Sequence, residues 1–229
     1  DSSGKPLYPE QWNDKKLKDF ERKNNLRYHS QMMNDPGASE FNPLTLDIIN
    51  ECFVDKERVP QDLRITIHLD TAFKSQESQA RGDNSVIVVC GHTTDGKSKV
   101  YFLEARGSNI WGMEDFLDQL VKIVKRYQKQ KSWISHITDE QEGGGKMGSW
   151  EHAIKARFRI DGITPIPKFV MLKRSVKNRK LSRMVEASGY FHQGLVKIVR
   201  GSPGMDDLIW QGCRIGVADI DDYFAAFSD

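Results

Sequence analysis

Features that mark several common protein classes are missing from this 229-residue sequence. No apolar run approaches the roughly 20 residues that a membrane-spanning helix needs. The first residues contain no apolar stretch of the kind that signal peptides carry. No phosphate-binding loop of the GxxxxGK(S/T) type occurs, which excludes an ATPase site of that kind. Because the net charge is only +2, a nucleic-acid site must come from lysine and arginine residues that cluster locally.

Cysteine is also scarce, and its positions do not suggest a metal site. Cys52, Cys90 and Cys213 lack the short spacings that zinc-binding cysteines show. Cys90 lies in an apolar run, which favours buried, reduced thiols in an intracellular protein. With 38% hydrophobic and 29% charged residues, the chain fits one sizeable domain, or one domain with a small appendage.

The order of the expected elements suggests an arm followed by one domain. Residues 1–62 are predicted to form the arm, and Pro60 interrupts the chain just before the first strand of the domain at 63–229. Alternating and helical hydrophobic patterns then predict strands and helices in turn. The expected strands are 64–70, 85–91, 99–105, 133–138, 168–172 and 195–199, and the expected helices are 114–129, 147–159, 181–189, 205–215 and 221–227.

This order of elements predicts the fold class. Three strands joined by hairpins, followed by helix, strand, helix, strand and helix, are typical of a ribonuclease H-like α/β domain. We therefore predict a mixed sheet of about five or more strands flanked by helices. The run SVIVVCG at 85–91 is continuously apolar, which favours a central strand. Four tryptophans, Trp111, Trp133, Trp150 and Trp210, are interpreted as aromatic residues of the core.

Acidic residues follow two of the predicted strands. Asp70 ends strand 64–70, and Asp139 and Glu140 follow strand 133–138. If the helix between these strands is an ordinary right-handed crossover, the two strands are parallel. Their carboxyl ends then lie at the same edge of the sheet, and Asp70 faces the same crevice as Asp139 or Glu140.

A third acidic pair, Asp221 and Asp222, begins the last predicted helix and adds a carboxylate to this edge. Three ionised carboxylates repel one another strongly unless cations separate them. Mg²⁺ suits such a site because it is a hard cation that takes oxygen ligands and keeps several waters. Two ions about 4 Å apart can activate a water and stabilise the leaving oxygen in phosphodiester hydrolysis. Each acid alone also has an ordinary explanation, since turns and helix N-termini often carry solvated acids.

A basic run follows strand 168–172, at the edge where the acids are expected. Such runs often form only a solvated face. The location of this one favours contact with a phosphate backbone. The candidate DNA-binding residues are Lys173, Arg174, Lys177, Arg179 and Lys180.

Several short motifs occur in a fixed order along most of the chain. They are SQMMNDP at 30–36, HLDTA at 68–72 with GDNS at 82–85, ITDEQEGG at 137–144, KLSRM at 180–184 and DDYFAAFS at 221–228. Strand-end acids and paired aspartates are common, but the ordered set is fairly specific. It resembles the C-terminal nuclease domain of the large terminase subunit of tailed bacteriophages.

The resemblance implies a metal-dependent endonuclease that cuts concatemeric double-stranded viral DNA in the cytoplasm of the host cell. It implies Mg²⁺ or Mn²⁺, two ions, as cofactor, and no membrane partner. The ATPase domain of the same polypeptide, the portal ring and the small terminase subunit are the implied partners, and the ATPase half is missing from this chain. Asp70, Asp139 and Asp222 are the expected catalytic residues, and the expected metal ligands are Asp70, Asp139, Glu140, Asp221 and Asp222.

Two positions depart from the family pattern. Either Asp139 or Glu140 can occupy the second acidic position, and we favour Asp139 because it follows the strand directly. Ala225 stands where the family usually has aspartate, on the same helical face as Asp221 and Asp222. It is either a natural residue or an introduced substitution that weakens the enzyme. The alternative function is therefore a catalytically weakened module that binds DNA or docks on the portal.

Overall fold

The computed structural model describes residues 13, 15–18, 43–71, 84–96, 98–130, 133–141, 148–173, 180–215 and 222–227. Within these ranges it does not describe the side chains of residues 140, 141, 148–150, 171–173, 180–182 and 225. The chain divides into two compact units, Asp1–Pro43 and Leu44–Asp229. In the first unit, residues 15–18 are helical, and the Lys16 N–H donates a 3.0 Å hydrogen bond to Asn13 Oδ1 at the start of this turn.

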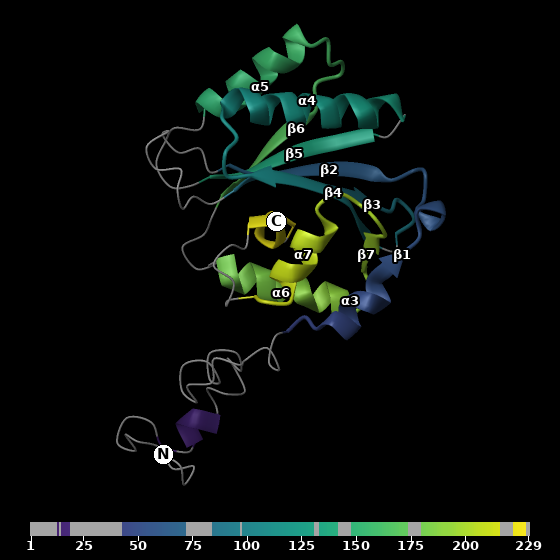
Figure 1. The fold of residues 1–229 in the computed structure, drawn as a ribbon, viewed down its shortest axis with the longest axis vertical. Coiled ribbons are helices and arrows are strands. Elements are labelled where there is room, and N and C mark those ends of the chain that lie inside the picture. Colours follow the sequence, from purple (N-terminus) through teal and green to yellow (C-terminus); the bar gives the residue numbers. More distant parts are fainter. Residues whose placement is uncertain are drawn as a thin grey trace. The chain divides into compact units, whose positions relative to one another are not determined.

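A mixed seven-stranded sheet with the order β1-β7-β4-β3-β2-β5-β6 forms the second unit (Figure 1). The pairs β2–β3 and β3–β4 are antiparallel, and the other neighbouring pairs are parallel. The strands are β1 (Phe53–Val54), β2 (Arg64–Asp70), β3 (Ser85–His92), β4 (Val100–Ser108), β5 (Trp133–Gln141), β6 (Lys168–Lys173) and β7 (Val196–Val199).

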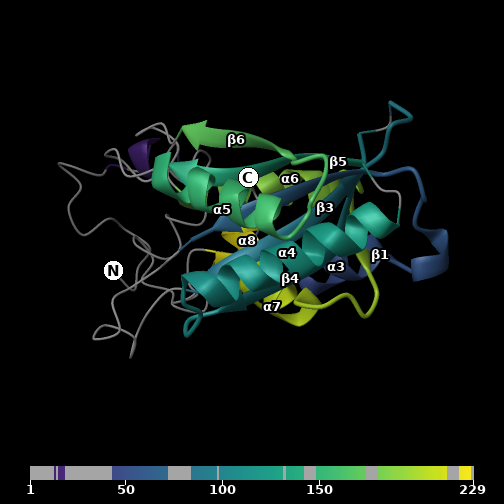
Figure 2. The same cartoon turned by 90° about the horizontal axis from the view of Figure 1, so that it is seen from above.

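Helices cover both faces of this sheet. Figures 1 and 2 show α4 and α5 on one face and α3, α6, α7 and α8 on the other. Each face has its own hydrophobic core, because alternate residues of β2, β3 and β4 point to opposite sides. The helices are α3 (Leu46–Cys52), α4 (Met113–Lys129), α5 (Gly148–Ile160), α6 (Lys180–His192), α7 (Met205–Gly212) and α8 (Asp222–Phe227), with a 3₁₀ turn η3 (Lys56–Arg58).

Helix α4 is the crossover between the parallel strands β2 and β5. Its buried residues include Phe116, Leu120 and Val124, which recur every four residues and so lie on one side of the helix. The Gly112 N–H donates to Asp115 Oδ2 at 3.2 Å, which satisfies one of the free N–H groups at the start of the helix. The parallel pairing of β2 and β5, predicted from this crossover, is confirmed.

The predicted ribonuclease H-like element order is confirmed, and β2 has the predicted bounds. The second unit begins at Leu44, whereas the sequence analysis placed the boundary after residue 62. Residues 44–62 belong to the sheet unit because β1 pairs with β7 and α3 packs into the core. Helix α6 continues through Gly189, where the sequence predicted its end.

For two of the four tryptophans assigned to the core, Trp133 and Trp210, the prediction is wrong. Trp133 is 66% exposed because it begins β5 at the end of the sheet. Trp210 is 48% exposed on α7, and the Arg214 guanidinium lies 4.7 Å from the centre of its ring. All three cysteines are free, and Cys52 and Cys90 are buried as expected. No described helix is both long and apolar enough to cross a membrane.

Candidate metal centre

Strands β2 and β5 bring two of the predicted acids to one edge of the sheet. In the parallel ladder, Leu69 pairs with Asp139, so Asp70 lies one residue further along the same edge. Asp70 is partly exposed and Asp139 is buried at 6% exposure. The sequence prediction that these strands end together at one edge is therefore confirmed, although the residues lie about seventy positions apart in the chain.

Helix α8 brings Asp222 to the same edge. The Asn84 N–H donates a 2.7 Å hydrogen bond to Asp222 Oδ2. Asn84 directly precedes β3, whose Val86 pairs with Asp70, so the start of β3 lies beside the end of β2. Asp222 itself is only 3% exposed. Asp70 and Asp222 therefore come from elements that pack together at this edge, and Asp139 lies on β5, the strand beside β2.

Aromatic packing fixes the position of α8. Phe224 stacks on Phe191 of α6 with ring centres 5.9 Å apart, and Phe227 contacts Phe102 of β4 edge-on at 6.1 Å. Burial of a phenylalanine side chain contributes about 2 to 3 kcal/mol. The Phe224 N–H also donates to Gln211 Oε1 of α7 at 3.0 Å. These contacts hold the helix, and with it the carboxylate at its first residue.

A glycine lets α8 approach the sheet. A Cβ added at Gly107 of β4 would come within 2.8 Å of both the Tyr223 hydroxyl and the side chain of Val86. These distances are too short for ordinary van der Waals contact, so a side chain at 107 would displace the side chain of Tyr223 or of Val86. Tyr223 follows Asp222 in the chain, and the absence of a side chain at 107 therefore helps to set the location of the third acid.

The electrostatic environment of Asp139 is unusual for a buried carboxyl. Its Oδ1 is buried and has no hydrogen-bond partner among the described residues. Burial, and then repulsion by the charge of Asp70, raise the pKa of Asp139 to about 7. A bound cation would stabilise the ionised form of such a carboxyl, because the cation would contact the buried oxygen and offset the repulsion from the second carboxylate.

One cation from the protein lies close to this edge. Burial lowers the pKa of the Arg183 guanidinium, while the charge of Asp70 acts in the opposite direction. Arg183 belongs to α6, so this helix supplies positive charge beside the first acid. In the sequence, Arg183 belongs to the KLSRM motif and continues the basic run that follows strand 168–172. Its proximity to Asp70 depends on the docking of α6 against the sheet, which no local pattern reveals.

A polar ladder lies behind the acids on the α6–α8 side of the sheet. His68 Nδ1 lies 2.8 Å from Thr138 Oγ1 on the neighbouring strand, and Thr66 Oγ1 lies 3.0 Å and 2.8 Å from the Nε2 atoms of His68 and His92. Burial lowers the pKa of His68 to about 3, so its ring is neutral. The His68–Thr138 contact joins β2 to β5 just before Asp70 and Asp139. No local sequence pattern predicts these side-chain contacts.

Several predicted site residues lie outside the described part of the structure. These are Asp221, Arg174, Lys177 and Arg179, together with the side chains of Glu140, Lys173, Lys180 and Ala225. Among the described residues, no group of three or more histidine, cysteine, aspartate or glutamate side chains is arranged to hold a metal ion. Metal binding by Asp70, Asp139 and Asp222 therefore stays a prediction.

The backbone places both ends of the basic run. Lys173 ends β6 opposite Gln141, the last residue of β5, so the run leaves the sheet at the edge that carries the acids. Lys180 begins α6, the helix that carries Arg183. The run thus connects two elements that border the carboxylates, and contact of its side chains with DNA stays a prediction.

Comparisons with known proteins add evidence for the fold. No protein-family model matches the chain, and no curated protein sequence matches it. The human cytomegalovirus terminase nuclease domain is similar in structure, with a TM-score of 0.55 and 9% sequence identity over 81% of this chain and 92% of that chain. The same domain soaked with Mn gives 0.52, with the same identity and coverage. The large terminase nuclease of thermophilic phage G20c with bound magnesium gives 0.47 at 14% identity, over 79% of this chain and 95% of that chain.

At these low identities the similarity concerns the fold. The seven-stranded sheet, its strand directions and the helices on both faces correspond to a ribonuclease H-like architecture. The resemblance inferred from the ordered motifs is confirmed at this level: the chain has the fold of terminase nuclease domains.

Proposed function

We propose that this chain is a divalent-metal-dependent endonuclease that hydrolyses phosphodiester bonds of double-stranded DNA. One observation carries the proposal: Asp70, Asp139 and Asp222 lie at one edge of the sheet, where Asp139 keeps a buried oxygen without a hydrogen bond. The resemblance to terminases adds the biological substrate, which is concatemeric viral DNA during genome packaging. It also adds Mg²⁺ or Mn²⁺ as the cofactor.

The residues present fit a divalent cation. Oxygen ligands from carboxylates suit Mg²⁺ and Mn²⁺, and the raised pKa of Asp139 is the effect that a neighbouring cation reverses. Asp70, Asp139 or Glu140, and Asp222 with Asp221 would hold two ions, and water would complete their coordination. When bound, such ions supply an activated water and stabilise the leaving oxygen of the phosphodiester.

The chain's own residues would prepare this site and hold the substrate. The backbone of Asn84 orients Asp222, and the His68–Thr138 contact keeps Asp70 and Asp139 at a fixed separation. Arg183 adds positive charge beside Asp70, which offsets the repulsion between the acids. The basic run Lys173, Arg174, Lys177, Arg179 and Lys180 would contact phosphates of the backbone. Such contacts position DNA without reading its sequence, so we expect cleavage with little sequence preference.

The resemblance also supplies partners for this proposal. The ATPase domain of the same polypeptide would drive DNA into the capsid, and the portal ring and the small terminase subunit would bind the assembled motor. In that setting the nuclease cuts the concatemer as packaging proceeds. These partners rest on the sequence motifs alone.

The identity of the second acid can be tested separately. Strand alternation assigns position 140 to the same face of β5 as Thr138, and Asp139 to the opposite face. We retain Asp139 as the favoured ligand because its buried Oδ1 has no hydrogen-bond partner among the described residues. Asp139→Asn should then abolish Mn²⁺-dependent cleavage, whereas Glu140→Gln should preserve most of it. The reverse result would assign the position to Glu140.

A plasmid-nicking assay with Mn²⁺ tests the function itself. The wild-type chain should convert supercoiled plasmid to nicked and linear forms, and EDTA should stop the reaction. Asp70→Ala should reduce the rate by about a thousandfold, because loss of a metal-held transition state costs several kcal/mol. The matched control is Asp206→Asn, an exposed acid in the first turn of α7, which should leave the rate unchanged. Cleavage that survives Asp70→Ala would contradict the proposal and favour a module that binds DNA without cutting it.

A further inference from the structure

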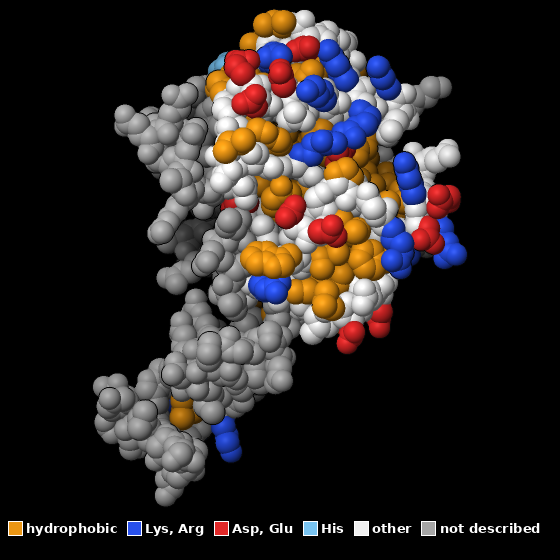
Figure 3. Space-filling model, in the orientation of Figure 1, with side chains coloured by type: hydrophobic (Ala, Val, Ile, Leu, Met, Phe, Trp, Pro, Cys, Tyr) orange, Lys and Arg blue, Asp and Glu red, His pale blue; other side chains and the backbone are white. Residues whose placement is uncertain are grey.

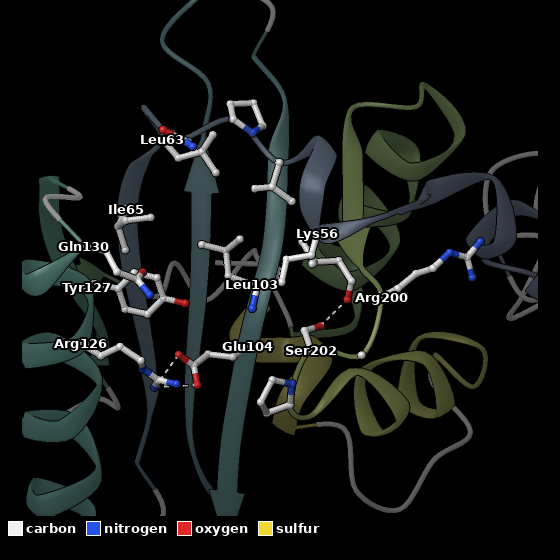
Figure 4. Close-up of a pocket in the computed structure, with 16 residues that line it drawn as sticks. Lys56, Leu63, Ile65, Leu103, Glu104, Arg126, Tyr127, Gln130, Arg200 and Ser202 are labelled. Carbon is white, nitrogen blue, oxygen red and sulfur yellow. Dashed lines mark hydrogen bonds and ion pairs between the residues drawn. The ribbon is translucent and has the colours of Figure 1, made fainter.

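A second concave site lies far from the acids, beside the last turns of α4. This hollow, which we call the α4 hollow, has a volume of about 610 Å³ (Figure 4). That volume falls within the range of roughly 300 to 1,000 Å³ found for ligand sites. Its lining includes Leu63, Ile65, Leu103 and Val199, which contribute aliphatic surface from β2, β4 and β7 and their flanks. These side chains recognise shape and not hydrogen-bonding groups.

The α4 hollow is separate from the candidate metal centre. Ile65 lies near the start of β2 and Asp70 at its end, about 17 Å apart along the strand. Ile65 also belongs to the hydrophobic core on the α4 side of the sheet, whereas α8, which carries Asp222, packs on the other side. A ligand in the hollow would leave the acids accessible, so this inference stands apart from the proposed nuclease activity.

The hollow carries an excess of positive charge. Glu104 is the one acidic residue among those that line it, and its carboxylate is 2% exposed. The guanidinium of Arg126 lies 2.7 Å from this carboxylate and that of Arg106 lies 3.3 Å from it. One carboxylate cannot neutralise two guanidiniums, of which Arg126 lines the hollow and Arg106 lies beside it, and the exposed Lys56 adds a further charge to the lining. In the space-filling view, basic and hydrophobic side chains lie side by side below α4 (Figure 3).

Arg200 also lines the hollow but does not add to this excess. Its guanidinium lies 3.4 Å from Asp55 and 4.6 Å from the centre of the Phe53 ring. Figure 4 shows its side chain directed away from the other residues of the hollow. The unbalanced charge therefore lies at Lys56 and at the pair of arginines around Glu104.

The wall formed by the turn after β7 is rigid. Gly204 has a φ of +74°, and a Cβ added there would come within 2.6 Å of the Ala105 carbonyl oxygen. The Ala105 N–H donates to the Pro203 carbonyl oxygen at 2.7 Å, and Ser202 Oγ donates to the Val199 carbonyl oxygen at 2.7 Å. These contacts fasten the turn to β4 and β7. A preformed wall lowers the entropy cost of binding.

We propose that the α4 hollow binds a segment of a partner polypeptide in which a large apolar side chain stands beside acidic residues. The aliphatic floor would take the apolar side chain, and Lys56 and Arg126 at the rim would attract the acids. A small anionic metabolite fits less well, because the buried Glu104 carboxylate already engages the Arg126 guanidinium and the exposed Lys56 lies at the surface. Peptide recognition by an apolar anchor with charged flanks matches this distribution.

Titration of the methyl-labelled 229-residue chain with capped peptides tests this proposal by NMR. The probe is the peptide GDFEG, with GDAEG and GKFKG as matched peptides that lack the aromatic anchor or reverse the charge. GDFEG should bind in roughly the millimolar range and move the methyl signals of Leu63, Ile65, Leu103 and Val199. GDAEG and GKFKG should each bind at least about threefold more weakly. Equal binding of GKFKG, or shifts confined to other parts of the chain, would overturn the proposal.

Two substitutions in the same turn provide the control. Lys56→Glu reverses the charge at the rim and should weaken GDFEG binding about threefold. Arg58→Glu makes the same change in η3 at a residue that does not line the hollow, and should leave binding within experimental error. Both residues are exposed, so neither change should affect folding. Equal effects of the two substitutions would show that the peptide responds only to the overall charge of this region, which would refute a defined binding site.

Discussion

Two buried carboxyl groups of this fold, Glu104 and Asp139, have opposite surroundings. Glu104 lies between the guanidiniums of Arg106 and Arg126, and its Oε1, which has no hydrogen-bond partner among the described residues either, lies 2.7 Å from an Arg126 guanidinium nitrogen. Asp139 has another carboxylate, that of Asp70, as its electrostatic neighbour, and one of its oxygens has no hydrogen-bond partner among the described residues. Both lie on strands of one sheet and both are nearly inaccessible to solvent.

The comparison distinguishes an acid whose charge is balanced by neighbouring residues from an acid whose charge is not balanced in this way. A buried charge with its counter-charges in place is compensated within the fold. A buried acid without them remains protonated to an unusually high pH, or requires a cation from outside the chain. The pKa of Asp139, raised to about 7 by burial and by Asp70, is the sign of that second condition. Function is therefore expected where the fold leaves charge uncompensated.

Removal of both guanidiniums around Glu104 should have the largest effect on stability. The double substitution Arg106→Met and Arg126→Met leaves a buried carboxylate without a counter-charge, which typically costs about 3 to 5 kcal/mol. Urea denaturation at pH 8 measures the loss. The triple variant that also carries Glu104→Gln removes the buried charge and should recover part of it. Equal free energies of unfolding for the double variant and the wild type would show that the two guanidiniums do not stabilise the buried carboxylate of Glu104.

Neutralisation of Asp139 should act in the opposite direction. Between pH 4 and its native pKa of about 7, Asp139 keeps a proton that the unfolded chain has lost, so wild-type stability falls as pH rises through this window. Asp139→Asn removes that loss and should stabilise the metal-free protein at pH 8 by roughly 2 kcal/mol. Glu104→Gln, the same chemical change at the compensated acid, should destabilise it by about 1 to 2 kcal/mol.

The pH profile distinguishes these substitutions from general effects on packing. Urea midpoints measured in EDTA at pH 4, 6 and 8 should converge for wild type and Asp139→Asn at pH 4 and separate at pH 8. The exposed-acid control Asp206→Asn should stay within about 0.5 kcal/mol of wild type throughout. A constant difference between Asp139→Asn and wild type at all three values would show that Asp139 does not titrate with a raised pKa.

Added Mn²⁺ should stabilise the wild type, and the gain should depend on pH. A ligand at 100 times its dissociation constant stabilises a folded protein by about 2.7 kcal/mol. The ion must displace the proton on Asp139, so its affinity should fall up to about tenfold, or 1.4 kcal/mol, between pH 7 and pH 6. Thermal unfolding with and without Mn²⁺ at both pH values measures this. Equal gains at the two values, or an undiminished gain in Asp70→Asn, would exclude these acids as the ligands.

The smallest effect is expected at position 225. Ala225→Asp would place a carboxylate one helical turn from Asp221 and Asp222 and should maintain or raise Mn²⁺-dependent cleavage, by about threefold at most. Initial rates of plasmid nicking provide the measurement, with Ala226→Asp as a destabilising contrast because Ala226 is fully buried. A clear drop in cleavage by Ala225→Asp, with folding intact, would place position 225 outside the site.

Local patterns predicted the parts of this fold that depend on local alternation. Strand β2 was located to the residue because its apolar positions alternate without interruption and all face the core on the α4 side of the sheet. The edge shared by Asp70 and Asp139 followed from the handedness of one crossover. Strand β1 was missed because two residues carry no periodicity, and its identity depends on pairing with β7, far along the chain.

The missing parts of the site are contacts between distant residues. Asn84 meets Asp222 across 138 positions, and His68 meets Thr138 across 70. Asparagine before a strand and histidine within one have many ordinary uses, so nothing local distinguishes these two. The approach of Arg183 to Asp70 likewise depends on how α6 docks against the sheet. Sequence alone located the acids, and tertiary packing added the groups that orient them.

The contact between His68 and Thr138 joins the two strands of the acidic edge to each other, whereas α8, the third element at this edge, is held in a different way. Backbone hydrogen bonds and the His68–Thr138 side-chain contact join β2 to β5, so the pairing of these strands sets the spacing of Asp70 and Asp139. The third aspartate arrives on a six-residue helix held chiefly by aromatic contacts. In the proposed nuclease, a change in the spacing of the three carboxylates would therefore come from a movement of α8, because β2 and β5 are joined to each other along their length.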